Sequence, residues 1–454
     1  MNVKLENIRH VFFIGIGGIG MSALARYFHQ MGCAVVGYDR TESDLTRALE
    51  GEGISVFYED NVKLIPKGFE TPSEDNLVVY TPAVPQDLSV KNAFQRRGFE
   101  LLKRSEVLGL ISKEKFTIAV AGTHGKTTTS TLIAHVLTQA DVECSAFLGG
   151  ISANFNSNIL ISEGDIVVVE ADEFDRSFLT LHPDIAVVTS LQADHLDIYS
   201  GFGEVVKSFE DFLGQIKPDG KSVVRKGLKV SGDMSYGLEK EADARAEDIE
   251  IKNGDFYFTY RDQETVFEKM YMAVPGYHNV ENAVAAISVG RLLGIDLALI
   301  KQGLATFKGV KRRFEYIVKN EKNIYIDDYA HHPAEVEAFL TSVRKMYPRK
   351  KLTVVFQPHL YSRTRDFAED FAQALSLGDQ LFLLDIYPAR ELPIEGVSSE
   401  WLIEKVSGAR KEVVSKEKLL ERVGQEKPEL IVTMGAGDID RLVKPIKEKL
   451  EANA

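Results

Sequence analysis

Cysteine is scarce in this chain of 454 residues, and Cys33 and Cys144 are the only two. Two cysteines build neither a disulfide framework nor the paired spacing of a zinc site, which favours a reducing compartment. Long apolar runs are also missing, since no uncharged stretch approaches the roughly 20 residues of a membrane span. We therefore expect a cytoplasmic protein without a membrane partner.

An excess of positive charge is the second thing that the sequence lacks. Lysine and arginine number 54 against 67 acidic residues, which gives a net charge of −13. Broad nucleic-acid binding needs clustered positive charge, so we expect no nucleic-acid partner. The apolar run from Val11 to Ala25 contains four glycines and continues into further ordered sequence, unlike a signal peptide.

Length and alternation of elements predict an α/β protein of three domains, at about 150 residues per domain. Apolar runs that are rich in β-branched residues predict strands covered on both faces, in parallel sheets. We place the domains at 1–112 (Rossmann-like), 113–312 (a parallel sheet of the P-loop ATPase type) and 313–454 (Rossmann-like). Residues 220–275 are polar and rich in turns, and they suggest a small antiparallel patch inside the second domain. The expected strands include 10–14, 33–38, 77–80, 116–121, 166–169, 185–188, 352–356, 380–386 and 430–433, and the expected helices include 21–31 and 280–293.

The first strand runs into a glycine turn of the form G-x-G-x-x-G, directly before a helix. Glycines let the backbone approach a pyrophosphate, and the helix start supplies N–H donors. An acidic residue about 20 positions further on can accept hydrogen bonds from a ribose. We therefore predict a diphosphate ligand, either a dinucleotide or a nucleotide sugar, at Gly15, Gly17, Gly18, Gly20, Met21, Ser22 and Asp39.

A second glycine turn ends in Gly-Lys-Thr, like a phosphate-binding loop, but only two residues separate its glycines. Lys126 would reach the β- and γ-phosphates, and the Thr127 hydroxyl would bind Mg²⁺. A lysine just inside a helix start is opposed by the helix dipole unless an anion binds there. The residues predicted to bind ATP here are Gly122, Thr123, His124, Gly125, Lys126, Thr127 and Thr128.

Acidic and histidine residues stand at the ends of two further strands of the same expected sheet. Glu170 follows three valines, and His195 follows the next strand along the chain. Because the carboxyl ends of parallel strands share one edge of a sheet, both should face the phosphate loop. We predict that Thr127, Glu170 and His195 are the metal ligands.

Together these motifs resemble the Mur ligases, ATP-dependent enzymes that form amide bonds in peptidoglycan synthesis. The resemblance covers nearly the whole chain, and the shortened Gly-Thr-His-Gly-Lys-Thr-Thr-Thr loop is typical of the family. It implies that the N-terminal domain binds a UDP-sugar, the central domain binds ATP and Mg²⁺, and the third domain closes over the site and helps to bind an amino acid. It assigns catalytic roles to Lys126, His195, Arg313 and His331, further ATP contacts to His278, Asn279, Asn282 and Asp327, and the amino acid or the reacting carboxylate to Tyr329, His359 and Arg363.

The activity implied by the resemblance is ATP-dependent addition of L-alanine to the carboxylate of UDP-N-acetylmuramate, by a monomer or weak homodimer. A ligase that attaches a whole tripeptide to the same sugar is the nearest alternative. A nicotinamide-dependent oxidoreductase would use the first glycine turn but leave the Gly-Lys-Thr loop unexplained. A non-catalytic nucleotide-binding regulator would bind ATP without releasing ADP.

Overall fold

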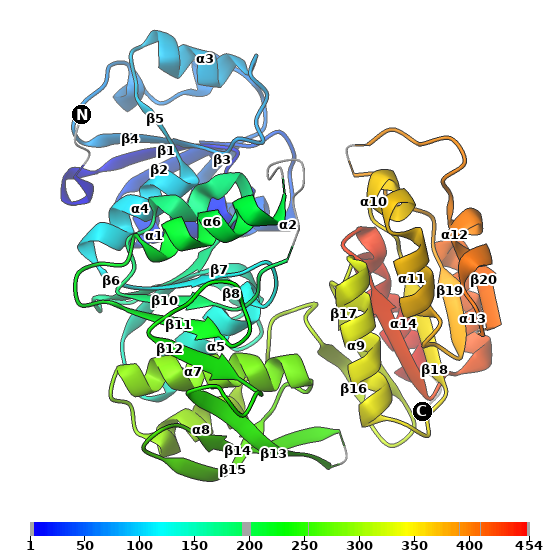
Figure 1. Cartoon of the computed structure of the whole chain (residues 1–454). Helices are drawn as coiled ribbons and strands as arrows, with labels where there is room; N and C mark the ends of the chain where they lie inside the picture. Colours follow the sequence, from blue (N-terminus) through cyan, green and yellow to red (C-terminus); the bar gives the residue numbers. More distant parts are fainter. Residues whose placement is uncertain (1–3, 193–200, 253, 390, 409, 452–454) are drawn as a thin grey trace. The chain divides into compact units, whose positions relative to one another are not determined.

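Three separate β-sheets make up the computed structural model, which describes residues 4–192, 201–252, 254–389, 391–408 and 410–451 (Figure 1). The chain divides into two compact units. The first unit consists of Met1–Ile249, Phe258–Ala273 and Val280–Lys308, and the second of Glu250–Tyr257, Val274–Asn279 and Gly309–Ala454. The expected α/β class is confirmed.

The first sheet is wholly parallel, with strand order β3-β2-β1-β4-β5. Its central strand β1 carries Phe12 and Phe13, which are both fully buried because helices cover the two faces. The strands are β1 (His10–Ile14), β2 (Ala34–Tyr38), β3 (Ser55–Phe57), β4 (Asn76–Tyr80) and β5 (Leu101–Lys103). The helices are η1 (Leu5–Asn7), α1 (Ile19–Gln30), α2 (Asp44–Gly51), η2 (Val62–Leu64), η3 (Lys67–Phe69), α3 (Ser89–Arg96) and α4 (Arg104–Glu114).

The second sheet has ten strands in the order β15-β14-β13-β12-β11-β10-β6-β9-β7-β8. Its middle is parallel, with β6 (Phe116–Ala121) between β10 (Ile185–Val188) and β9 (Ile166–Ala171). The remaining strands are β7 (Cys144–Ser152), β8 (Ser157–Leu160), β11 (Lys221–Arg225), β12 (Met234–Gly237), β13 (Ala244–Lys252), β14 (Asp255–Arg261) and β15 (Val266–Met272). The helices are α5 (Lys126–Gln139), η4 (Phe174–Thr180), α6 (Phe202–Leu213), α7 (Tyr277–Leu292) and α8 (Leu297–Thr306).

The antiparallel patch expected within residues 220–275 covers only the last part of that range. Strand β11 continues the parallel sheet from β10, and β12 and β13 each pair in parallel with the strand before them. The polar, turn-rich sequence did not reveal these parallel pairs, because each of the three strands is only partly buried and is therefore not uniformly apolar. Strands β13, β14 and β15 are neighbours in the sheet and follow one another through short turns, as antiparallel strands do, and β7 also pairs antiparallel with β8.

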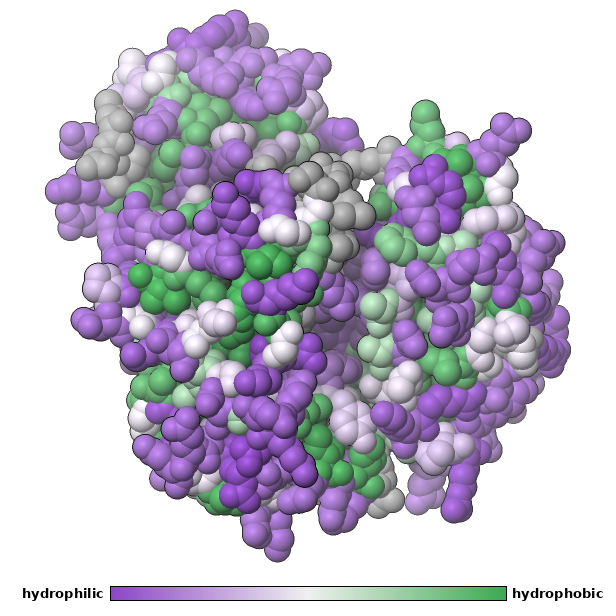
Figure 2. Space-filling model, in the orientation of Figure 1, coloured by the Kyte–Doolittle hydropathy of each residue, from purple (hydrophilic) through white to green (hydrophobic). Residues whose placement is uncertain are grey.

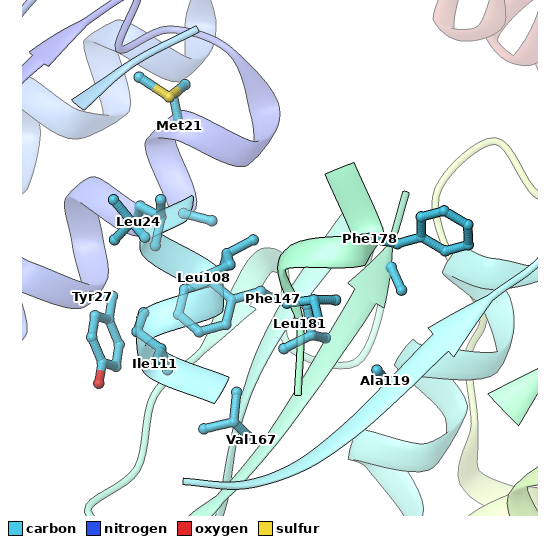
Figure 3. Close-up of a cluster of buried hydrophobic side chains, with 14 of the residues drawn as sticks. Met21, Leu24, Tyr27, Leu108, Ile111, Ala119, Phe147, Val167, Phe178 and Leu181 are labelled. Atoms are coloured by element: carbon cyan, nitrogen blue, oxygen red, sulfur yellow. The ribbon is translucent and has the colours of Figure 1, made fainter. Parts of the chain in front are cut away.

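The first and second sheets are joined into one unit by helices α1 and α4. Tyr27 of α1, Leu108 of α4 and Phe147 of β7 belong to one buried cluster, which Figure 3 shows spanning both domains. Polar contacts add to it, since Asn158 of β8 donates to the carbonyl of Ile19 and accepts from Arg26. The two glycine turns are therefore carried by a common hydrophobic core.

The third sheet lies in the second unit, with strand order β16-β17-β21-β18-β19-β20. All its pairs are parallel except β16 with β17. Its strands are β16 (Glu315–Lys319), β17 (Ile324–Asp328), β18 (Leu352–Phe356), β19 (Gln380–Leu383), β20 (Arg410–Val413) and β21 (Leu430–Met434). Its helices are α9 (Pro333–Met346), α10 (Tyr361–Asp366), α11 (Ala368–Leu375), α12 (Ser399–Lys405), α13 (Lys416–Glu426), η5 (Asp438–Leu442) and α14 (Val443–Glu451).

The exact domain limits that the sequence suggested stay a prediction. The limit at 112 falls in the last turn of α4, and the second unit resumes at Gly309 rather than at 313. Hydrophilic residues cover most of the face that Figure 2 displays. Among the described residues, no helix combines the length and the apolar character that crossing a membrane requires.

Candidate functional site

The first glycine turn connects β1 to α1 and is braced by a carboxylate. The N–H of Gly17 donates to Oδ2 of Asp39 over 2.8 Å, and the N–H of Thr41 donates to Oδ1 over 3.1 Å. A Cβ on Gly17 would stand 2.9 Å from that same Oδ2, so the turn requires glycine there. The structure places Asp39 at the turn, where it accepts from the backbone in a contact that the G-x-G-x-x-G pattern did not reveal. Its contact with a ribose stays a prediction.

Two residues predicted to contact the ligand of this turn are buried. Met21 is 2% exposed and Ser22 is 0% exposed, and the Ser22 hydroxyl donates to the carbonyl of Ile19. Both side chains pack into the core beneath α1, and the contact of these two residues with a ligand stays a prediction. Gly18 caps the helix without a side-chain contact, which leaves backbone N–H groups as the donors that the turn presents.

The second glycine turn connects β6 to α5 and is tied down by the segment that follows β10. The His124 N–H donates to the Ser190 hydroxyl over 2.7 Å, and the Thr189 hydroxyl donates to the His124 carbonyl over 2.5 Å. Gly122 has a φ of +142°, and a Cβ there would stand 2.1 Å from the Thr189 hydroxyl. The sequence motif did not identify Thr189 or Ser190, since neither belongs to the loop.

Lys126 points back into its own loop. Its ammonium donates to the Gly122 carbonyl over 2.7 Å and to Oε2 of Glu173 over 2.6 Å. The side chain of Glu173 is only 2% exposed and that of Lys126 only 13%. Burial opposes the charge on Lys126, but nearby carboxylates, Glu173 foremost, outweigh that cost and raise its pKa. The lysine is therefore a charged group, and its ion-pair partner Glu173 was not among the predicted residues.

Thr127 and Glu170 meet as the sequence predicted. The Thr127 hydroxyl donates to Oε1 of Glu170 over 3.1 Å, and the Gly149 N–H donates to Oε2 over 2.9 Å. A Cβ on Gly149 would stand 2.3 Å from the Glu170 carboxylate, so glycine is required opposite it. Hydroxyl and carboxylate oxygens are ligands that Mg²⁺ accepts, with phosphate oxygens and water completing its shell. The donor set therefore fits magnesium.

The third predicted metal ligand, His195, lies outside the described residues. Within the described part of the chain, no group of three or more His, Cys, Asp or Glu side chains is placed to hold a metal ion. Thr128, which was predicted to contact ATP, is buried, with 8% of its surface exposed to solvent.

The residues at the start of α7 have different surroundings. A Cβ on Gly125 would stand 3.1 Å from Oδ1 of Asn282, which places Asn282 beside the phosphate loop. Asn279 is 3% exposed and donates to the Pro275 carbonyl over 2.7 Å, so it holds the turn that precedes the helix. His278 is an exposed residue whose ring lies 6.2 Å from that of Phe314. Asn282 therefore lies next to the second glycine turn within the first unit.

Asp327 does not present a carboxylate to a ligand in this structure. It is 0% exposed, its Oδ1 accepts from the Thr433 hydroxyl, and its Oδ2 accepts from Arg312 over 3.2 Å. Burial raises its pKa to about 6. These contacts indicate that Asp327 anchors β17 to β21 and to Arg312. The ATP contact that the family pattern implied stays a prediction.

The predicted histidines and arginines of the second unit gather around Tyr329. The Arg313 guanidinium lies 5.2 Å from the centre of the Tyr329 ring, and the centres of the Tyr329 and His331 rings are also 5.2 Å apart. His331 in turn lies 5.9 Å from His359, ring centre to ring centre. Burial lowers the pKa of His331 and, with the charge of Arg363, lowers that of His359 to about 4. Both imidazoles are therefore uncharged near neutral pH.

Two polar atoms of this cluster are buried without a hydrogen-bond partner among the described residues: Nδ1 of His359 and Nη1 of Arg363. Leu360, which lies between them in the sequence, has a φ of +72°, a strained conformation for a leucine. Buried donors without partners are costly unless a ligand meets them. A guanidinium beside neutral imidazoles suits the carboxylate of a small zwitterion.

A cavity of about 190 Å³ opens between the first and second sheets. Gly20 and Arg104 line one side of it, and Gly149, Glu170 and Asp172 line the other. A second cavity of about 360 Å³, at the opposite ends of β1 and β4, contains none of the predicted site residues. Of these two cavities, the smaller one therefore brings Gly20 of the first glycine turn together with Glu170, the predicted metal ligand.

Family models and relatives agree with this architecture. The Mur ligase family catalytic domain matches residues 10–116, the Mur ligase middle domain residues 120–290, and the Mur ligase glutamate ligase domain residues 312–437. UDP-N-acetylmuramate–L-alanine ligase of Christiangramia forsetii is 49% identical over 446 residues, which are 98% of each chain. The same-named protein of Cytophaga hutchinsonii is 49% identical, covering 98% of this chain and 97% of its own.

Solved structures are also similar. The UDP-N-acetylmuramate-alanine ligase of Thermotoga maritima has a TM-score of 0.82 at 28% identity, covering 98% of this chain and all of its own. A murein peptide ligase of Psychrobacter arcticus has a TM-score of 0.68 at 22% identity, covering 97% and 99% respectively, which is a likeness of fold.

Proposed function

The chain belongs to the Mur ligase family, and from this premise we infer that it is an ATP-dependent ligase that joins L-alanine to UDP-N-acetylmuramate in peptidoglycan precursor synthesis. The observation that carries the inference is near-half identity over almost the full length of relatives with that name. The structure adds a phosphate loop and a separate glycine turn in one unit, as two anionic substrates require.

The reaction has two steps. An oxygen of the sugar-borne carboxylate attacks the γ-phosphorus of ATP, the bond to the β–γ bridging oxygen breaks, and ADP leaves. The amine of L-alanine then attacks the carbonyl carbon of the acyl phosphate, phosphate leaves, and the amine loses its proton. Because the protein forms no covalent bond, its contribution is positioning and neutralisation of charge.

We assign the first step to the two turns of the first unit. Lys126 is a buried ammonium at the start of α5, and it would bind the β- and γ-phosphates while Asn282 and the backbone of the loop hold the nucleotide. Thr127 and Glu170 would hold Mg²⁺, with His195 as a further ligand. When bound, the ion neutralises phosphate charge. The first turn would hold the UDP diphosphate through backbone N–H groups.

We assign the amino acid to the second unit. Arg363 has a buried donor without a described partner, so it would bind the carboxylate of L-alanine. His331 and His359 are neutral bases that could take the proton of the attacking amine. Arg313, stacked on Tyr329, would offset negative charge at the acyl phosphate.

The test is ADP release with ATP and UDP-N-acetylmuramate, while the amine acceptor is varied. L-alanine should stimulate release strongly, and the alanyl-glutamyl-diaminopimelate tripeptide should not. Stimulation by the tripeptide alone would assign the chain to the recycling ligases. Removal of Mg²⁺ with a chelator should abolish ADP release. In a separate experiment, sedimentation should show a monomer or a weak dimer. We propose a cytoplasmic location, where ATP is available.

A further inference from the structure

Among the described residues, Arg104 is the one cationic side chain that lines the cavity between Gly20 of the first glycine turn and Glu170. It is the first residue of α4, and Ile19 and Gly20 of α1 lie on the same side of the cavity. The opposite side carries the carboxylates of Glu170 and Asp172 together with Gly149. The cavity thus has a guanidinium facing the predicted metal-binding carboxylate.

The packing of Arg104 explains the last glycine of the first turn. A Cβ on Gly20 would stand 2.3 Å from Nη1 of Arg104 and 2.8 Å from its Cδ. Only glycine at position 20 lets the arginine lie across the start of α1 and reach the cavity. The sequence pattern assigned Gly20 to diphosphate binding. Its lack of a side chain therefore also makes room for the guanidinium of Arg104.

Within the described part of the chain, the Arg104 guanidinium has no hydrogen bond or ion pair. Arg104 is partly buried, and arginines withdrawn from water ordinarily pair with an anion. The Glu170 carboxylate already accepts from Thr127 and from the Gly149 backbone. The position of Arg104 therefore suits an anionic group brought by a ligand.

We propose that Arg104 binds the carboxylate of the sugar substrate and holds it toward the γ-phosphate. This inference rests on the proposed function. A guanidinium matches a carboxylate with two parallel hydrogen bonds. It also offsets repulsion between the incoming carboxylate and Glu170 and Asp172. The UDP diphosphate has its own donors in the backbone of the first turn, which leaves Arg104 for the carboxylate.

The test compares two ligands that share the UDP diphosphate and differ in the carboxylate. Binding of UDP-N-acetylmuramate and of UDP-N-acetylglucosamine is measured by calorimetry, with displacement for the weaker ligand. Arg104→Gln should weaken binding of the first by roughly 10- to 100-fold, as loss of a charged hydrogen-bonded pair does. Binding of the second should change less than about threefold. The affinity of Arg104→Lys for UDP-N-acetylmuramate should lie between those of the wild-type protein and Arg104→Gln, because lysine keeps the charge but cannot form the two parallel hydrogen bonds.

Arg96→Gln is the matched control, since Arg96 is exposed on α3 and bonds only its own helix at Asn92. It should leave both affinities unchanged. Equal weakening of both ligands by Arg104→Gln would assign Arg104 to the diphosphate and overturn the proposal, and so would no weakening of either. Should Arg104→Gln not fold, the Arg104→Lys comparison decides by the same criterion. Failure of the wild-type protein to bind UDP-N-acetylmuramate would instead overturn the proposed function.

Discussion

The two glycine turns of the first unit have the same local plan, but different groups support them. Each follows a parallel strand and opens a helix, α1 in one case and α5 in the other. In the first turn a carboxylate, Asp39, accepts a backbone N–H and the side chains that follow are buried. In the second turn the side chains of Lys126 and Thr127 project and are held by Glu173 and Glu170.

The difference shows how the same local plan of strand, glycine turn and helix can serve two purposes. A turn that offers only backbone N–H groups can hold a diphosphate, but it has no side chain that could stabilise the charge that develops during a reaction. A turn that positions an ammonium and a metal-binding hydroxyl can do so, and it requires carboxylates from neighbouring strands to stay in place. Four substitutions would test this division, from the largest expected effect to the smallest.

Removal of the ammonium should have the largest effect. Lys126→Ala is expected to lower the turnover of ADP release by at least about 10²-fold, as loss of one preorganised electrostatic group does. Binding of the UDP-sugar, measured separately by calorimetry, should stay the same because the first turn does not use Lys126.

Lys217→Ala is the matched control for this experiment. Lys217 also pairs with a carboxylate, Asp184 at 2.8 Å, and with a backbone carbonyl, but it lies outside both turns. Its loss should lower stability and leave turnover per folded molecule unchanged. A Lys126→Ala enzyme with near-normal turnover would refute the chemical role of the second turn.

Gly149→Ala should act on the second turn through Glu170. The new methyl group would stand within 2.4 Å of both Glu170 oxygens and must displace the carboxylate. We expect the Mg²⁺ concentration for half-maximal ADP release to rise about tenfold, the lower range for losing a contact that orients a metal ligand. Gly203→Ala, where a Cβ meets open space, should not change the Mg²⁺ titration.

Asp39→Ala should weaken the first turn alone. The Gly17 N–H loses its acceptor, which costs roughly 1 kcal/mol or more where the group is part-buried. The KM for the UDP-sugar should rise about fivefold, while the KM for ATP stays constant. Asp39→Asn keeps an oxygen acceptor and should restore most of the loss; an equal rise in both KM values would contradict separate roles for the turns.

The smallest effect concerns the helices that follow the turns. His135 of α5 is 3% exposed, bonds Thr306, and has a pKa that burial lowers to about 4, whereas His29 of α1 is exposed. An imidazole with a lowered pKa costs stability as the pH falls from 6.5 toward 4, because the unfolded chain binds the proton more readily. That cost is about 1 kcal/mol between pH 7 and 5.5.

Denaturant unfolding at those two pH values measures this cost. His135→Gln should remove it and flatten the pH dependence, whatever its effect on stability at pH 7. His29→Gln should leave the pH dependence unchanged, and an equal flattening by both would contradict the difference between the helices.

Sequence patterns predicted the elements with strong local signals. Strands 116–121, 185–188 and 352–356 are confirmed to the residue, because continuous buried β-branched runs have few alternatives. The helix expected at 21–31 begins at Ile19 instead, since Gly18 rather than the end of the motif caps it. The pairing of Thr127 with Glu170 was also predictable, because both stand at the carboxyl edge of one sheet.

What the sequence could not show are contacts between distant segments. Glu173 was one acidic residue among several after β9, and nothing local distinguishes it as the partner of Lys126. Thr189, Ser190 and Gly149 look ordinary in the sequence, and only their approach to the loop gives them a role. The two contacts of Asp327 with Thr433 and Arg312 were likewise not visible in the sequence.

The shared core under α1, α4 and β7 means that the spacing between the two glycine turns, and between the substrates that we propose they bind, is set when the chain folds. The entropy of bringing two reactants into register is then lost once, during folding, and not in every catalytic cycle. Intramolecular arrangements of this kind can raise the effective concentration of a reacting group to 10⁵ M or more, on the order of 7 kcal/mol of barrier. The interface between the first two domains thus fixes the distance between the two reactants of the proposed first chemical step.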